Sequence, residues 1–288
     1  MTGLVAHLKA IDLDELNALA SLQTRVDRKY VVSVAALGPV LADLDGDSRA
    51  LEIDGVRGSQ YESVYFDTDS LESYQAAAHR RRRRFKVRTR AYLDSADCYL
   101  EVKTRGGRSL TVKERIAHPS ERRSRLTREG VDYVDSALAD AGIDAVGADN
   151  ATTGEQGARA LHPTMVTRYQ RTTLFVPARS DLPGTASRAT IDVDLSWTTT
   201  DRRGVEGITL ATPGLAIIET KSGSTSSRVD RVLWSHGIRP VNISKYGVGM
   251  AAIHPGLPSN KWHRVLEGQL LPAAAPPSPA LSHPDQRT

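Results

Sequence analysis

From Arg84 to Arg90 a basic residue occupies every second position of the segment 84–92, RFKVRTRAY, and mostly apolar residues fill the places between. Successive side chains of a β-strand point to opposite faces, so this alternation predicts a strand with one basic face and one mostly apolar face. The basic positions are Arg84, Lys86, Arg88 and Arg90. Such a basic face must either meet solvent or line a space that holds an anion.

Similar patterns mark most of the other predicted strands. They are the segments 23–33, 59–66, 98–105, 109–116, 164–176, 188–197, 215–222 and 241–250. Apolar spacing and capping residues predict helices at 12–20, 34–44, 69–79, 127–141 and 226–238. Because most strands follow one another through short turns, we expect a largely antiparallel α+β fold, with a closed barrel as one form of it.

Composition limits the possible classes of protein. The chain has 288 residues, of which 40% are hydrophobic, which is enough for a real core. Its net charge is +4, with 38 Lys and Arg against 34 Asp and Glu, so the placement of charge matters more than the total. Cys98 is the single cysteine, which excludes an intrachain disulfide and a multi-cysteine metal site. The sequence shows neither a signal peptide nor a run of about 18 apolar residues, and we expect a cytoplasmic protein.

The charged faces admit two interpretations. In an ordinary sandwich the apolar faces pack together and the charged faces meet water, which would account for any single strand. In a barrel covered by helices the charged faces would instead line the lumen, and they would need an anion and acidic partners to offset desolvation. Many lysines and arginines with a few carboxylates suit polyphosphate together with a divalent metal, Mg²⁺ or Mn²⁺.

Nine short motifs follow one another in a family-like order. They are RVDRKY, YFDT, FKVRTRAY, YLEVKTR, TVKER, TRYQRTTLF, RATIDVDL, IIETKS and ISKYG. In this order and spacing, over residues 21–250, the chain resembles the VTC (vacuolar transporter chaperone) domain, a branch of the triphosphate tunnel metalloenzymes, or CYTH-like superfamily. The resemblance implies an eight-stranded antiparallel β-barrel that forms a tunnel, with flanking helices. It also implies a metal-dependent polyphosphate polymerase, which transfers the γ-phosphoryl group of ATP onto a polyphosphate chain.

Matched motif by motif, the resemblance implies roles for individual residues. Those implied to hold the transferred phosphate in catalysis are Arg88, Arg90, Arg168 and Arg188. Those expected to bind other phosphates are Lys29, Lys103, Lys113 and Lys245, joined by Lys86 and Lys221 on the same charged faces. Glu219 of IETK is the implied ligand of Mn²⁺ or Mg²⁺, and Asp27 is a second candidate. The superfamily signature Glu-x-Glu-x-Lys reads Arg25, Asp27 and Lys29 here, so its first acid is missing.

The same reasoning divides the chain and names its partners. We expect an N-terminal helix in 1–20, a VTC-like tunnel domain in 21–253 and a largely disordered tail in 254–288. The expected partners are ATP and polyphosphate. A separate membrane partner is left open, and no nucleic acid is expected.

Three alternatives stay open. A hydrolase of the same fold would cleave inorganic triphosphate or a nucleoside triphosphate, with Asp192 or Asp194 orienting the water. A non-catalytic module would bind polyphosphate without turnover. A nucleic-acid-binding protein would use the run Arg80–Arg84, but no stacking platform is interleaved with that run and no recognised binding motif is present. We interpret Arg80–Arg83 as a solvated basic patch, with the further hypothesis that it attracts polyanions towards a tunnel mouth.

Overall fold

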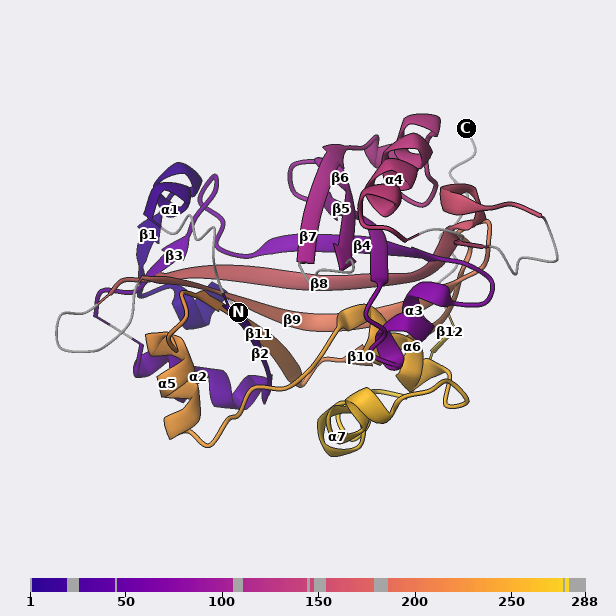
Figure 1. The fold of residues 1–288 in the computed structure, drawn as a ribbon. Coiled ribbons are helices and arrows are strands. Elements are labelled where there is room, and N and C mark those ends of the chain that lie inside the picture. The colour runs from indigo at the N-terminus through magenta and orange to yellow at the C-terminus, as the bar shows by residue number, and fades with distance from the viewer. Residues whose placement is uncertain are drawn as a thin grey trace, which may run out of the picture.

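The computed structural model describes residues 2–19, 26–44, 46–105, 111–143, 146–147, 154–178, 186–276 and 278–279. In these ranges the chain forms one twelve-stranded sheet with helices packed around it (Figure 1). The two long strands β8 and β9 cross the middle of the view, with β5, β6 and β7 above them and β2 and β11 below.

Eight strands of this sheet curve around a cavity. Along the sheet they follow the order β2, β11, β9, β8, β4, β5, β6, β7, and every neighbouring pair is antiparallel. Their bounds are Val26–Ser33, Leu215–Ser222, Ser187–Thr200, His162–Val176, Ser59–Asp67, Arg84–Tyr92, Cys98–Arg105 and Thr111–Ala117. The α+β fold with eight antiparallel strands is therefore confirmed. Among the described residues no ladder joins β7 to β2, so the barrel is open along that seam.

Four short strands that the sequence did not predict extend the sheet. β1 (Lys9–Ile11) pairs in parallel with β3 (Arg49–Leu51), and β3 also pairs with β8. β10 (Glu206–Thr212) pairs with β9 and with β12 (Ser278–Pro279). Three of these strands have only two or three residues, too few for an alternating pattern to show.

Helices cover the outer, apolar face of the curved sheet. α2 (Leu37–Ala42) and α5 (Arg228–Ser235) pack on β2, β9 and β11 in one apolar cluster. α4 (Arg128–Asp140) packs on β5 and β6 in another. Because the apolar sides of these alternating strands are buried against helices, their charged sides face inward. This arrangement decides between the two interpretations of the charged faces in favour of the lined cavity.

Local capping explains where several helices begin. Thr127 accepts a hydrogen bond from the backbone N–H of Gly130 at 3.0 Å and starts α4. Ser227 and Asp230 form a reciprocal capping box at the start of α5. The other helices include α1 (Leu13–Leu19) and α3 (Glu72–Ala78). No helix in the described ranges is both long and apolar enough to cross a membrane.

The strand predicted at 241–250 is wrong, because most of this segment is the helix α6 (Lys245–Ile253). Ser244 caps it by accepting from the N–H of Gly247 at 3.4 Å. A Cβ at Gly247 would lie 2.3 Å from the indole of Trp262, and one at Gly249 would lie 2.2 Å from that of Trp197. The two glycines therefore reflect the close approach of a helix to two tryptophans, and their spacing of two is not a strand period.

The C-terminal segment, predicted to be largely disordered from residue 254, is folded as far as 276. Trp262, Val265, Leu266 and Leu270 are buried in the same apolar cluster as α6. They belong to a short 3₁₀ turn, to α7 (His263–Val265) and to a π-helical turn at 266–270. Burial of these side chains outweighs the polar and proline-rich composition around them. Residues 277 and 280–288 lie outside the described part of the chain.

Candidate functional site

The inward-facing charges meet in a cavity of about 490 Å³. Its walls come from β2, β4, β5, β6, β7, β8 and β11, together with the segment that leads into α6. Ten of the twelve predicted site residues line it: Asp27, Lys29, Lys86, Arg88, Arg90, Lys103, Lys113, Glu219, Lys221 and Lys245. With Arg171, the walls carry nine lysine and arginine side chains but only three carboxylates, those of Asp27, Glu101 and Glu219. The cavity thus has a clear excess of positive charge.

Glu101 on β6 is the centre of the most tightly paired group. Its carboxylate accepts from Arg88 at 2.6 Å and from Lys113 at 3.0 Å, and Arg90 lies 3.5 Å away. The side chain is only 4% exposed. Burial alone would raise the pKa of Glu101, but the charges and hydrogen bonds of Arg88 and Lys113 lower it to about 2. The sequence places Glu101 on the charged face of its strand, where a carboxylate is expected to pair with the basic groups.

Asp192 on β9 forms a second paired group. Both of its oxygens accept from Arg171 on β8, at 2.6 and 2.8 Å, and Lys245 donates to it from the start of α6. Burial opposes the charge of Asp192, yet Arg171 and Lys245 lower its pKa to about 2. Lys245 was predicted to come from a strand. It reaches the cavity from the first residue of a helix instead, where α6 meets the sheet.

Glu219 on β11 is held much more loosely. Its carboxylate lies 3.9 Å from the Nζ atoms of Lys29 and Lys221, and among the described residues it accepts no hydrogen bond. Burial would raise the pKa of Glu219, but Lys29 and Lys221 outweigh it and lower the pKa to about 2. In the ladder of β11 with β2, Glu219 faces Lys29, and Asp27 faces Lys221 two residues along. Two carboxylates therefore share one wall of the cavity.

This donor set suits a hard divalent ion that is held mainly by its substrate. The described residues contain no group of three or more Asp, Glu, His or Cys placed to enclose a metal. Mg²⁺ commonly keeps several waters and is bound through one or two carboxylates plus substrate phosphates. Glu219 and Asp27 match that pattern, since both line the cavity beside its lysine and arginine side chains.

Two lysines in the cavity lack a carboxylate partner in the described ranges. Lys86 donates to the hydroxyl of Ser244 at 2.6 Å, and Lys103 stands opposite it in the β5–β6 ladder. Burial, together with the charges of Lys29 and Arg88, lowers the pKa of Lys86 well below its usual value. Burial and Lys29 lower the pKa of Lys103 as well. Both ammonium groups would therefore be stabilised by an anion in the cavity.

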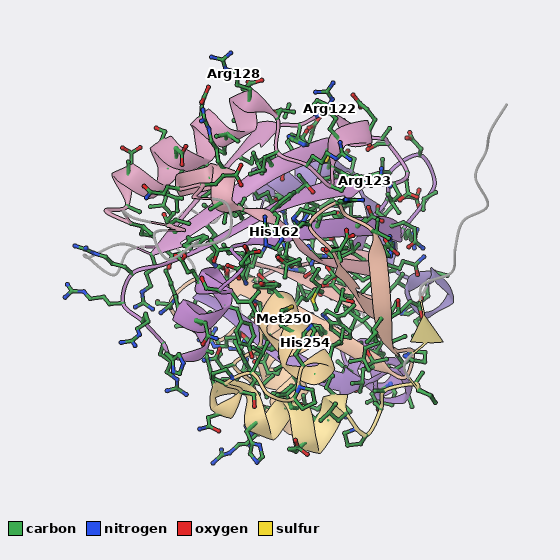
Figure 2. The ribbon with its side chains drawn as sticks, turned by 90° about the vertical axis from the view of Figure 1, so that its right-hand side faces the viewer. Arg122, Arg123, Arg128, His162, Met250 and His254 are labelled. Atoms are coloured by element: carbon green, nitrogen blue, oxygen red, sulfur yellow. The ribbon has the colours of Figure 1, made fainter. Side chains whose placement is uncertain are left out.

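Arg168, predicted to hold phosphate, does not line the cavity. Its Nε donates to Glu62 at 2.8 Å, and its other nitrogens pair with Glu206. Glu62 also accepts from Arg123, which lies on the α4 side of the molecule (Figure 2). In TRYQR, Arg168 and Arg171 are three residues apart and so lie on opposite faces of β8. Arg171 is the one that faces inward, on the same side as Tyr169.

Arg188 and Asp194 also lie away from the cavity lining. Arg188 shares the inward face with Lys221, its partner across the ladder, but its Nη2 donates to Asn17 of α1 at 2.9 Å. Asp194 is exposed and has φ of 52°, where the pairing of β8 with β9 shifts register. The bulge ends the simple alternation of β9, which is why Asp194 does not share the inward face of β9 with Asp192.

A comparison with models of protein families agrees with the nine motifs of the sequence. The family model of the VTC domain matches residues 24–254. A comparison with curated proteins gives no match. Among solved structures, a putative adenylate cyclase from Bacillus halodurans has 14% identity and a TM-score of 0.40 over 77% of this chain and 94% of its own. A putative adenylyl cyclase from Hippeastrum, described with a dominant triphosphatase activity, has 12% identity and a TM-score of 0.38 over 79% and 96%.

These structural scores are low, and the assignment rests on the family model. That model covers the eight strands around the cavity and the whole of α6. All ten of the predicted residues that line the cavity lie inside it. The chain belongs to the VTC domain family.

Proposed function

We propose that this protein is a metal-dependent polyphosphate polymerase that transfers the γ-phosphoryl group of ATP onto a polyphosphate chain. The observation that carries the proposal is the cavity itself, where nine cationic side chains face three carboxylates. A cavity with this excess needs a compact, highly charged anion, and triphosphate and polyphosphate have that character. The family assignment makes phosphoryl transfer the chemistry that fits it best.

In this proposal the arginines hold the reacting phosphates. Arg88 and Arg90 would contact oxygens of the transferred group from β5, and Arg171 would do so from β8 in the place expected for Arg168. Their ion pairs with Glu101 and Asp192 fix the guanidinium groups before substrate arrives. Lys86 and Lys103 would neutralise neighbouring phosphates as point charges.

Glu219, with Asp27, would hold a Mn²⁺ or Mg²⁺ ion between the protein and the substrate phosphates. When bound, such an ion offsets charge on the phosphate oxygens. Ionised Glu219 is ready for this role at neutral pH, because its pKa is near 2 and no hydrogen bond in the described part of the chain has to be broken.

The transfer itself requires little covalent chemistry from the protein. An oxygen of the terminal phosphate of the acceptor attacks the γ-phosphorus of ATP, the bond from that phosphorus to the β–γ bridging oxygen breaks, and ADP leaves. The nucleophile is already an anion, so no strong general base is required. Positioning and neutralisation of charge by Arg88, Arg90 and Arg171 are the main contributions.

The hydrolase alternative receives less support from the geometry. It would need a group that orients a water molecule, and the sequence offered Asp192 and Asp194 for that task. Asp192 has both oxygens engaged by Arg171 and Lys245, and Asp194 is exposed outside the cavity lining.

We propose a cytoplasmic site of action, where ATP is available, with ATP and polyphosphate as partners and no nucleic acid.

The test is an assay of the purified protein with ATP and Mn²⁺, with and without a short polyphosphate primer. Products are separated on a gel and released phosphate is measured. Glu219→Gln is the site variant, and Arg128→Gln, an exposed change on α4, is its control. Long chains that disappear only in Glu219→Gln would support the polymerase. Free phosphate without chain growth would favour the hydrolase, and binding of polyphosphate without turnover would favour a non-catalytic module.

A further inference from the structure

One end of the cavity carries positive charge without carboxylates to balance it. In the β5–β6 ladder Lys86 faces Lys103, and Arg84 faces Arg105 two residues further along. In the described part of the chain none of these four side chains is ion-paired with a carboxylate, whereas Arg88, on the same strand, pairs with Glu101 at 2.6 Å. The Nε atom of Arg105 is buried and has no hydrogen-bond partner there. The cation excess of the cavity therefore increases towards this end.

The same excess continues onto the surface. Arg80–Arg83 are exposed and form the turn between α3 and β5. Hydrogen bonds hold this turn together, since the N–H of Arg81 donates to the carbonyl of Ala76 at 2.8 Å and the Nη1 of Arg84 donates to the carbonyl of Arg81 at 2.9 Å. Lys261 joins the group by donating to the carbonyl of Ala77, in the last turn of α3, at 2.7 Å. We call Arg80–Arg84 with Arg105 and Lys261 the arginine collar.

Electrostatics within the collar shows that its charges repel one another. Partial burial, together with Arg84 and Arg80, lowers the pKa of Lys261 to about 8. Burial and the charge of Arg105 lower the pKa of Arg84. A polyanion would relieve this repulsion, and it could run without interruption from the collar to Lys86 and Lys103 inside the cavity.

The size of the cavity explains why such a surface would be needed. Its volume of about 490 Å³ is small beside a long polyphosphate chain. That space accommodates a short run of phosphates, so the remainder of a long chain must pass through an opening. The collar is continuous with one end of the cavity and has the charge that this remainder requires.

We propose that the arginine collar binds the part of a polyphosphate chain that lies outside the cavity, so that the chain passes over Arg84 and Arg105. This inference rests on the proposed function, because it assumes polyphosphate as the ligand of the cavity. A nucleic acid is the rival polyanion, but it would gain from exposed aromatic side chains on which bases can stack. The ring beneath Lys261 is that of Trp262, which is 1% exposed and cannot stack on a base.

The experiment compares a short and a long ligand. Tripolyphosphate is short enough to stay within the cavity, whereas long-chain polyphosphate must also cross the collar. The test variant carries Arg80→Gln, Arg81→Gln, Arg82→Gln and Arg83→Gln. The control variant removes the same charge from four other exposed arginines, with Arg122→Gln, Arg125→Gln, Arg128→Gln and Arg159→Gln. Figure 2 shows Arg122 and Arg128 on the α4 side of the molecule.

The Kd of each ligand is measured calorimetrically at several salt concentrations. We expect the test variant to bind long-chain polyphosphate about tenfold or more weakly at low salt. We also expect its plot of log Kd against log salt to be flatter by up to about 3, at roughly 0.7 per lost contact as for single strands. Tripolyphosphate binding should stay within about twofold of wild type, since this ligand does not reach the collar. The control variant should match wild type with both ligands.

Three outcomes would overturn the inference: wild-type affinity of the test variant for the long chain, an equal loss in the control variant, or a loss for single-stranded RNA without one for polyphosphate. If wild type binds neither tripolyphosphate nor the long chain, the proposed function fails with it. If wild type binds both ligands and the test variant binds both as tightly as wild type, the collar proposal is wrong while the proposed function stands. A double variant, Arg81→Gln with Arg83→Gln, should show an intermediate effect, and circular dichroism checks that each variant is folded.

Discussion

Glu101 and Glu219 lie on two walls of the same cavity and share a pKa near 2, yet they are bound very differently. Glu101 is 4% exposed and accepts hydrogen bonds from Arg88 and Lys113. Glu219 is 20% exposed and only faces two lysines at 3.9 Å. A low pKa therefore shows that a carboxylate stands in a positive field, but the contact distances decide whether it is still available to a ligand.

The position of each residue in the sheet explains the difference. Glu101 lies on β6, between β5 and β7, and cations reach it from both neighbouring strands. Glu219 lies on β11 beside β2, the strand at the open seam, and its lysine partners are themselves 24–33% exposed. We infer that Glu101 is a fixed counterion of Arg88 and Arg90, whereas Glu219 is a group that can change partners.

The largest expected effect is on stability, from Glu101→Gln. This change leaves Arg88, Arg90 and Lys113 without their shared anion, and removing one partner of a buried ion pair costs about 3–5 kcal/mol. Glu219→Gln should cost only about 1 kcal/mol, because water can reach Lys29 and Lys221. Urea unfolding of both variants measures these free energies. Equal losses would mean that the two walls do not differ as the contacts indicate.

The next largest effect is on metal-dependent activity, where Glu219→Gln should cause the greater loss and Glu101→Gln the smaller one. Glu219→Gln should lower kcat/KM for ATP by about 100-fold, or about 2.7 kcal/mol, if the residue holds the metal. It should also weaken binding of Mn²⁺, measured by electron paramagnetic resonance without turnover. Glu101→Gln should leave the Mn²⁺ affinity within about threefold of wild type. A metal affinity that falls equally in both variants would remove the assignment of Glu219.

The effect of pH on Glu101 should be smaller but has a defined sign. Its pKa falls from 4.5 in the unfolded chain to about 2 in the folded one, so its charge stabilises the fold fully above pH 4.5. That stabilisation is lost as the pH falls from 4.5 towards 2. The gap in unfolding free energy between wild type and Glu101→Gln should therefore narrow by about 2 kcal/mol from about pH 6 to about pH 3. A gap that is constant over this range would mean that the loss in Glu101→Gln arises from packing.

Much of this comparison could be predicted from sequence, because it depends on strand alternation. The period of two placed Lys29, Arg88, Lys103 and Glu219 on the charged faces of their strands, and the structure brings all four together. The family motifs added the expectation that Glu219 is the carboxylate that binds the metal. Alternation gives the face of each residue relative to its own strand, and this is why it worked for regular strands.

The remainder could not be predicted, because it depends on contacts between distant segments. Arg168 and Arg171 lie on opposite faces of β8, and only the packing of the outer helices shows which face is inside. Lys245 required knowledge that Gly249 packs on Trp197, which turns a strand-like segment into a helix. The burial of Trp262 likewise follows from the surface that α6 offers, and the local composition at 254–276 does not reveal it.

The smallest expected effect would separate local contact from the general field of the cavity. Lys221 lies 3.9 Å from Glu219, and Lys113 lies 3.0 Å from Glu101, so each is a partly exposed lysine on one of the two carboxylates. A metal bound at Glu219 is repelled by the nearby ammonium of Lys221. Lys221→Gln should therefore tighten Mn²⁺ binding about fivefold, or about 1 kcal/mol, in the absence of nucleotide. Lys113→Gln removes the same charge from the other wall and should leave Mn²⁺ binding nearly unchanged. Equal tightening in both variants would show that the ion responds to the net charge of the cavity. In that case Mn²⁺ does not bind specifically at Glu219.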